Sequence, residues 1–139
     1  MSKPLPIQAI HHISRATRNL AASLDFYRDV LGFRPIWRPN FSFAGAWLFN
    51  YGLQIHLIAT EQSSDPNGED ANEKIETRVD HVAFHVSDLD EVERRLKDHG
   101  IAYRTNHVAD TGLMQLFFLD PDGNHIEAAT FPPVRELNE

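Results

Sequence analysis

The pattern of apolar and polar residues predicts eight short β-strands, and the first strand of each half alternates with a period of two. Four stretches lie near residues 8–16, 34–38, 44–50 and 53–59, and four near 80–86, 102–108, 113–119 and 124–130. After the first stretch of each set, apolar residues recur every three or four positions, which is typical of a helix. The helices are predicted from Leu20 to Leu31 and from Leu89 to Gly100.

Residues at the predicted element ends agree with this assignment. Gly32 is suited to follow the first helix, because glycine readily adopts the left-handed conformation found there. Asp88 is predicted to cap the second helix, with Glu91 completing a capping box. Turns are expected at Tyr51-Gly52 and at Asp120-Pro121-Asp122-Gly123, where proline presets φ and glycine accepts a positive φ.

The order strand, helix, three strands occurs twice, so the chain contains an internal repeat. His12 falls on His81 at an offset of 69 residues, and the segment 47–49 falls on 116–118 at the same offset. His56 meets Glu127 at an offset of 71. The small gaps that this alignment needs are placed in loops, which absorb insertions readily.

The repeat predicts an α+β fold of two tandem βαβββ modules, which form a concave mixed sheet with helices on its outer face. We expect a single domain over 1–139, with modules at 7–60 and 79–131 joined by a solvated, mobile linker at 61–78. One helix covers only one face of each sheet. Pairing the modules would therefore close the other face into a cleft, where ligand sites usually lie.

Four potential metal ligands occupy equivalent places, on the first and last strand of each module. They are His12, His56, His81 and Glu127. Strand alternation directs them to the concave face and directs apolar neighbours such as Ile55 under the helix. A single histidine on a strand is more often structural, but its recurrence in both modules favours a metal site. Imidazole and carboxylate bind zinc, nickel, iron, cobalt or manganese, and the sequence leaves the metal open.

The remaining histidines have weaker arguments for a role in binding. His11 is expected to point to the opposite face from its neighbour and to be structural. His85 and His125 line the groove, either as hydrogen-bonded residues or as groups that assist the metal ligands. His99 suits a helix C-terminus, and His107 is expected on the surface.

A dense aromatic set surrounds Arg38 in the first module. Its members are Trp37, Phe41, Phe43 and Trp47. These side chains either pack in the core or form a cleft wall that grips an apolar substrate. Arg38 either binds a carboxylate or lies on the surface.

Composition narrows the possible partners and locations. The 139 residues include 13 Lys and Arg against 20 Asp and Glu, a formal net charge of −7. This acidity argues against nucleic acid and anionic membrane surfaces. Because there is no cysteine, disulfides and thiolate metal sites are excluded. No apolar run is long enough to span a bilayer and the N-terminal residues lack a signal-peptide layout, so a cytoplasmic location is expected.

These residues resemble the vicinal oxygen chelate superfamily, which includes glyoxalase I, fosfomycin-resistance proteins and extradiol dioxygenases. The resemblance covers about Ile7 to Phe131, and the segments that carry it are 10–14, 25–33, 80–84 and 117–127. The stretch 38–49, followed by Ile55-His56-Leu57, is most similar to a glyoxalase I-like subgroup known from plants and bacteria.

The resemblance implies that His12, His56, His81 and Glu127 bind a divalent metal and that Glu127 is the catalytic base. In glyoxalase I the metal polarises an enediolate while a ligand carboxylate moves the proton. The resemblance thus implies a glyoxalase I-like lyase or isomerase that acts on a small oxygenated substrate. Glyoxalase I usually has a carboxylate in place of His56, so this chain departs from the pattern there.

The same resemblance leaves other functions open. An extradiol-type dioxygenase or a fosfomycin-type thiol transferase would use His12, His81 and Glu127. A non-enzymatic, metal-dependent small-molecule binding protein is a further alternative. The resemblance also implies a homodimer. Each site then either combines His12 and His56 of one chain with His81 and Glu127 of the other, or takes all four ligands from one chain.

Overall fold

The computed structural model describes residues 3–60 and 74–137. The chain forms two compact units, Met1–Gln62 and Ser63–Glu139, and each is described here by itself. The predicted linker, 61–78, lies mostly outside the described residues, and its described part, 74–78, contains no helix or strand. No helix in the described residues has the length and apolar character needed to cross a membrane.

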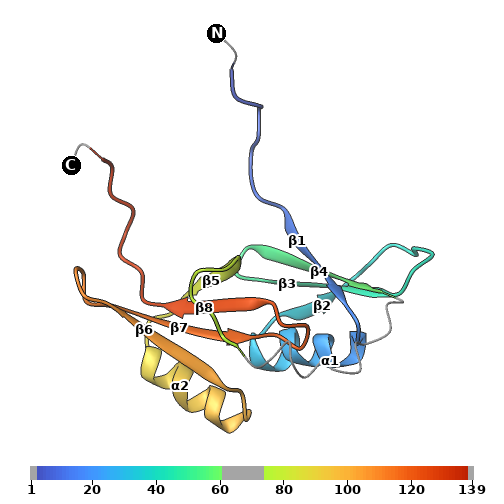
Figure 1. The fold of residues 1–139 in the computed structure, drawn as a ribbon. Helices are drawn as coiled ribbons and strands as arrows, with labels where there is room; N and C mark the ends of the chain where they lie inside the picture. Colours follow the sequence, from blue (N-terminus) through green and yellow to red (C-terminus); the bar gives the residue numbers. More distant parts are fainter. Residues whose placement is uncertain (1–2, 61–73, 138–139) are drawn as a thin grey trace. The chain divides into compact units, whose positions relative to one another are not determined.

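Each unit contains a strand, a helix and three further strands, in that order (Figure 1). The elements of unit 1 are β1 (His12–Thr17), α1 (Leu20–Asp25), η1 (Phe26–Val30), β2 (Arg34–Ile36), β3 (Gly45–Asn50) and β4 (Leu53–Ala59). Those of unit 2 are β5 (His81–His85), α2 (Leu89–Asp98), β6 (Tyr103–Val108), β7 (Leu113–Leu119) and β8 (His125–Ala129). The predicted α+β class with tandem βαβββ modules is confirmed.

The two sheets have the same topology. Unit 1 has the strand order β1-β4-β3-β2, and unit 2 has the matching order β5-β8-β7-β6. In each sheet the first and last strands are neighbours and run parallel, while the other pairs are antiparallel. The helix of each unit lies on one face of its sheet (Figure 1), where α1 contacts β3 and β4, and α2 contacts β8.

The core of each unit follows from strand alternation. In β4, Ile55 and Leu57 are 2% and 1% exposed, as expected for the face that packs toward the helix. Buried residues from the helical segment and from β3 complete the core of unit 1; they are Phe26, Tyr27, Phe33 and Leu48. In unit 2 the corresponding face consists of Leu116, Phe118, Ile126 and Ala128, with Leu96 of α2. Phe117 and Ala129 are also buried, on the face that carries Glu127.

Strand pairing corrects two details of the sequence prediction. The first strand begins at His12 rather than near Gln8, because its partner β4 begins at Leu53 and leaves nothing upstream to pair with. The predicted alignment of 47–49 with 116–118 is also wrong by one residue. Trp47 stands opposite His56, whereas Phe117 stands opposite Glu127, so these two positions are equivalent.

The helical segment of unit 1 was predicted as one α-helix, but its second half is a π-helix. Leu31 N–H donates to the carbonyl of Phe26, five residues earlier. The helical segment of unit 1 runs from its N-cap Asn19 to Gly32, which has φ of 84°. The distance along the chain is one residue longer than from Asp88, the N-cap of α2, to Gly100. The π-helix therefore takes up one extra residue relative to the second module.

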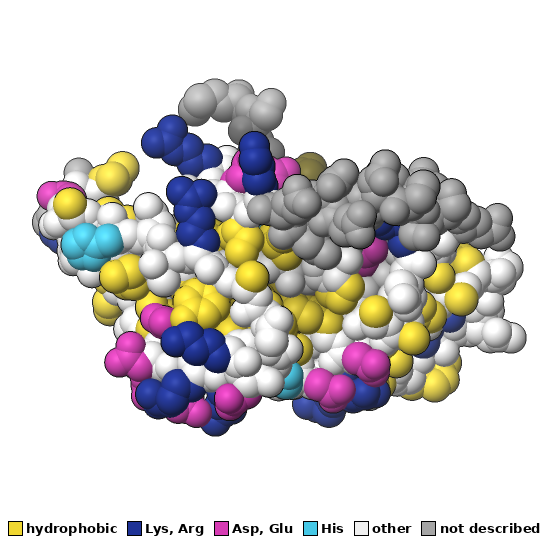
Figure 2. Space-filling view, turned by 60° about the horizontal axis from the view of Figure 1, so that its bottom comes forward, with side chains coloured by type: hydrophobic (Ala, Val, Ile, Leu, Met, Phe, Trp, Pro, Cys, Tyr) yellow, Lys and Arg dark blue, Asp and Glu magenta, His cyan; other side chains and the backbone are white. Residues whose placement is uncertain are grey.

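Helix α2 begins as predicted, with the Asp88 carboxylate accepting from the Glu91 N–H at 3.1 Å. The predicted capping box is wrong in its second half. The Glu91 carboxylate accepts from Arg94 and Arg95 instead, because these residues lie within one helical turn of it. Such pairs explain why acidic and basic side chains are intermixed on the surface seen in Figure 2.

The turns between the last two strands fix the register of each sheet. In unit 2, the buried Asp120 carboxylate accepts hydrogen bonds from Asp122 N, Asn124 N and Asn124 Nδ2 at 2.8–2.9 Å. Gly123 has φ of 84°, as its place in the predicted turn requires. In unit 1, Tyr51 and Gly52 both have positive φ, as a two-residue hairpin turn demands.

Candidate metal centre

The first ligand pair, His12 and His56, is brought together by the parallel pairing of β1 and β4. His12 lies opposite Gln54, and His56 lies two residues further on, opposite Ser14. Both histidines therefore project from the same face of the sheet. Their rings stack with centroids 3.9 Å apart and an interplanar angle of 13°. His12 is exposed, whereas His56 is only 7% exposed.

His56 is held between two rings and by one hydrogen bond. Trp47 stacks on the face of His56 with centroids 3.9 Å apart and planes 3° apart. Gln54 Oε1 lies 2.9 Å from His56 Nε2. Burial, followed by the charges of His12, His11 and Arg38, lowers the pKa of His56 from 6.5 to about 4. At neutral pH the ring is therefore uncharged and keeps a lone pair, as a metal ligand must.

His11 does not point away from this pair, so its predicted orientation is wrong. His11 Nδ1 lies 2.9 Å from His12 Nδ1, and the ring centroid of His11 is 6.4 Å from that of His56. The prediction assumed strand alternation at residue 11, but β1 begins only at His12. Outside a strand, neighbouring side chains are not forced to opposite faces.

The second pair, His81 and Glu127, occupies the same register positions in unit 2. His81 lies opposite His125, and Glu127 lies two residues further on, opposite Ala83. His81 Nε2 and Glu127 Oε1 are 3.1 Å apart. His81 is exposed and Glu127 is 2% exposed, so each unit combines an exposed histidine with a buried partner.

A hydrogen bond at Nδ1 of His81 determines which atom of the ring faces Glu127 with a lone pair. His81 Nδ1 lies 2.7 Å from the carbonyl of Val79, which can only accept, so Nδ1 carries a proton. In neutral His81 the Nε2 lone pair then faces the Glu127 carboxylate. Two facing acceptors need a proton or a cation between them.

The contact between His81 and Glu127 fits a divalent metal. Two ligand atoms on one metal, with bonds of about 2.0–2.2 Å and an angle of about 90–110°, are about 2.8–3.6 Å apart. The 3.1 Å separation between His81 Nε2 and Glu127 Oε1 lies in that range. Val79 at His81 and Gln54 at His56 also supply the outer hydrogen bonds that usually fix metal-binding histidines.

The second carboxylate oxygen of Glu127, Oε2, is oriented by two hydrogen-bonded side chains, Gln115 and Asn106, which the sequence analysis missed. Gln115 Nε2 donates to Glu127 Oε2 at 3.4 Å, and Asn106 Nδ2 donates to Gln115 Oε1 at 2.7 Å. Gln115 lies on β7, two residues before the partner of Glu127. A correct hairpin register would have placed it on the same face as Glu127.

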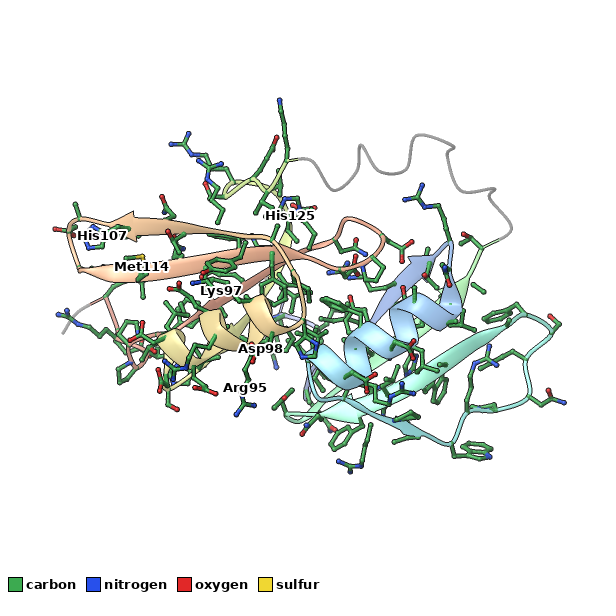
Figure 3. The ribbon with its side chains drawn as sticks, turned by 90° about the horizontal axis from the view of Figure 1, so that it is seen from below. Arg95, Lys97, Asp98, His107, Met114 and His125 are labelled. Atoms are coloured by element: carbon green, nitrogen blue, oxygen red, sulfur yellow. The ribbon has the colours of Figure 1, made fainter. Side chains whose placement is uncertain are left out.

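The remaining histidines are distributed around these pairs. His125 Nε2 accepts from Glu76 N at 3.0 Å and His85 Nδ1 accepts from Phe131 N at 3.0 Å, so both hold neighbouring backbone. His107 faces Met114 across the β6–β7 hairpin, well away from His125 (Figure 3). Among the described residues, no three potential ligands form one metal-binding group. The meeting of all four predicted ligands therefore stays a prediction.

These features define a class of protein: two βαβββ modules, each with a potential ligand pair on its parallel first and last strands. A sequence model of the Glyoxalase/Bleomycin resistance protein/Dioxygenase superfamily matches residues 9–128. The chain belongs to this superfamily, the vicinal oxygen chelate proteins, as the resemblance predicted.

Individual relatives fall in several branches. Glyoxylase I 4 of Arabidopsis thaliana is 38% identical over 127 residues, which cover 89% of this chain and 71% of that protein. Metallothiol transferase FosB of Staphylococcus haemolyticus is 30% identical over 129 residues, covering 89% of this chain and 84% of FosB. The crystal structure of the glyoxalase family protein from Enterococcus faecalis has a TM-score of 0.66 and 28% identity, with 88% and 97% of the two chains covered.

Proposed function

We propose that this protein is a divalent-metal-dependent lyase or isomerase of the glyoxalase I type, acting on a small oxygenated substrate. The observation that carries the proposal is the contact between His81 Nε2 and Glu127 Oε1, with Nδ1 of His81 already bound to a carbonyl. We assign the other two ligands to the equivalent pair in unit 1, His12 and His56, which lie side by side on one face of the sheet. The 38% identity to Glyoxylase I 4 supports the reaction type.

The four side chains have distinct tasks in this proposal. A bound zinc, nickel, iron, cobalt or manganese ion would supply Lewis-acid stabilisation of negative charge on substrate oxygen. His12, His56, His81 and Glu127 would hold it. The Glu127 Oε1 atom faces His81, so we assign proton transfer between neighbouring substrate carbons to Oε2. Gln115 keeps Oε2 in place at 3.4 Å.

The first test is metal content, measured by elemental mass spectrometry on untagged protein. We expect about one metal per chain in the wild type and loss of that metal in His56→Ala and Glu127→Ala. His107→Ala is the matched control, since it removes an imidazole on the β6–β7 hairpin (Figure 3). Protein that holds no metal even after reconstitution would contradict the four-ligand site.

The second test is turnover. Metal-loaded protein is expected to isomerise the hemithioacetal that methylglyoxal forms with glutathione or with another thiol. The rate of product formation measures this activity. If metal-loaded protein turns over none of these adducts, the reaction type is wrong although the metal site stands.

A thiol transferase is the second candidate, supported by the 30% identity to metallothiol transferase FosB. It would use His12, His81 and Glu127, and His56 would be dispensable for metal binding. The His56→Ala variant therefore separates the candidates, because retained metal in that variant favours the transferase.

For the assembly we propose a homodimer in the cytoplasm, with a small-molecule substrate and no nucleic-acid or membrane partner. The four ligands then come either from one chain or from two. Mixing equal amounts of His12→Ala and Glu127→Ala chains distinguishes these arrangements. If the ligands come from different chains, each heterodimer has one intact site of two, so a randomly exchanged mixture regains about a quarter of the wild-type metal content. If all four ligands come from one chain, it regains none.

A further inference from the structure

Arg38, in the segment between β2 and β3, is held in a fixed position by the aromatic residues around it. The centre of its guanidinium lies 4.8 Å from the ring of Phe41 and 5.1 Å from the ring of Phe43. Arg38 Nη2 also donates to the Phe43 carbonyl at 2.8 Å. The side chain is half-buried. Cation–π contacts of this kind hold a guanidinium while leaving its edge available.

Gly45 provides the space for this arrangement. A Cβ atom at residue 45 would lie 3.1 Å from Arg38 Nη2 and 3.3 Å from Nε, and only 2.3 Å from the Leu57 carbonyl oxygen. Any side chain at this position would displace the guanidinium or the neighbouring strand. The absence of a side chain at residue 45 therefore lets Arg38 lie against β3.

The charge of Arg38 lacks an acidic partner among the described residues. Three other arginines of this acidic protein have one: Arg28 pairs with Asp25 and Asp29, and Arg94 and Arg95 pair with Glu91. Arg38 uses one of its five N–H donors for the Phe43 carbonyl. A half-buried guanidinium with unused donors is suited to bind an oxyanion.

A continuous row of rings joins Arg38 to the candidate metal centre. Phe41, under the guanidinium, lies 6.0 Å from Trp47 between ring centroids. Trp47 in turn stacks on His56 at 3.9 Å. A ligand that lies along this row would place one end at Arg38 and the other at His56.

We propose that Arg38 is a specificity-determining residue that binds a carboxylate of the substrate, whose apolar part lies on Phe41 and Trp47. This inference rests on the proposed function and narrows its substrate class to oxygenated carboxylates. A planar guanidinium matches a carboxylate by two parallel hydrogen bonds. The aromatic rings select against small, fully hydrated anions.

The test compares two probes of nearly the same shape, phenylacetate and phenylacetamide, of which only phenylacetate is charged and accepts at both terminal atoms. Binding is followed by Trp47 fluorescence in a Trp37→Phe background, which leaves Trp47 as the single tryptophan. We expect phenylacetate to bind about 10- to 100-fold more tightly, as for a hydrogen-bonded charge pair. Arg38→Gln should abolish this preference and leave the affinity for phenylacetamide unchanged, which also shows that the rings remain folded.

Two further variants test the geometry. Arg38→Lys keeps the charge but loses the two-pronged fork, so most of the preference should disappear. Arg34→Gln is the matched control, because Arg34 also lies over a ring, Phe49, at 5.0 Å. It should bind both probes like the wild type.

The measurement is made on metal-free and on metal-loaded protein, so it is independent of the proposed reaction. Preference for phenylacetate in both forms supports the role of Arg38 even if no metal-dependent turnover is found. Equal affinity for the two probes, no detectable binding of phenylacetate, or an unchanged preference in Arg38→Gln would overturn it. Tighter binding of benzylphosphonate than of phenylacetate would overturn the carboxylate assignment in favour of a phosphonate.

Discussion

The two modules share a frame but differ in the chemistry that they place on it. Both pair an exposed histidine on the first strand with a buried group two register positions along the parallel last strand. In unit 1 that group is His56, stacked under Trp47, while in unit 2 it is the Glu127 carboxylate. The repeated register accounts for where the candidate ligands lie. In the proposed function this single difference assigns proton transfer to Glu127, because the lowered pKa of His56 makes its imidazole a weak base.

Replacing the buried group of each module should give the largest contrast. Glu127→Gln keeps the shape of the side chain but removes its charge, so kcat should fall about 100-fold or more. His56→Gln should weaken metal binding and leave kcat within about tenfold once metal is saturating. Steady-state kinetics at saturating metal measures both. An equal loss of kcat in the two variants would show that the modules do not divide the chemistry in this way.

The hairpin turns of the two modules should differ in their contribution to stability. Asp120→Ala removes three hydrogen bonds to a buried carboxylate, which should lower the free energy of unfolding by about 3 kcal/mol. Tyr51→Phe removes one exposed hydrogen bond, from Tyr51 Oη to the Leu31 carbonyl, worth about 1 kcal/mol. Urea denaturation measures both. Equal losses would mean that burial of Asp120 contributes nothing.

The helix caps offer the smallest contrast. Asn19 Oδ1 accepts from Ala22 N at 3.0 Å, and Asp88 Oδ1 accepts from Glu91 N at 3.1 Å. Replacing either residue by alanine should cost about 1 kcal/mol. The stability lost on replacing Asp88 should be smaller at high salt than at low salt, because salt screens the interaction of its charge with the helix dipole. The loss on replacing the uncharged Asn19 should not depend on salt. Thermal denaturation at low and high salt checks this, and identical salt responses would contradict it.

Sequence periodicity predicted most of the fold, and it predicted that His12 lies beside His56 and His81 beside Glu127, for a physical reason. Apolar residues recur along 53–59 and 113–119, and the structure has strands over the same ranges, with central residues buried on both faces. The capping contact at Asp88 and the turn at 120–123 are local and were also predictable. His11 and Gln115 were not, since one lies just outside a strand and the other depends on a register that the aligned repeat misplaced by one residue.

The helical segment limited the sequence prediction in a different way. Over the five residues 26–30, an α-helix and a π-helix present nearly the same spacing of apolar residues, so pattern alone cannot separate them. The extra residue was detectable only by comparing the number of residues between the helix N-cap and the glycine after the helix in the two modules. The hydrogen bond from Leu31 to Phe26 then identifies its place.

The π-helix η1 has a consequence for how the two halves of the chain tolerate changes in length. One residue added to an α-helix rotates everything after it by about 100°, which would turn the following apolar side chains away from the sheet. The π turn absorbs the residue instead, so Tyr27 remains buried at 3% exposure and Phe33 at 1%. An alignment of the halves should therefore open its gap inside 26–30. Deleting one residue there should yield a regular α-helix with both strand pairs, and the ligands on them, unmoved.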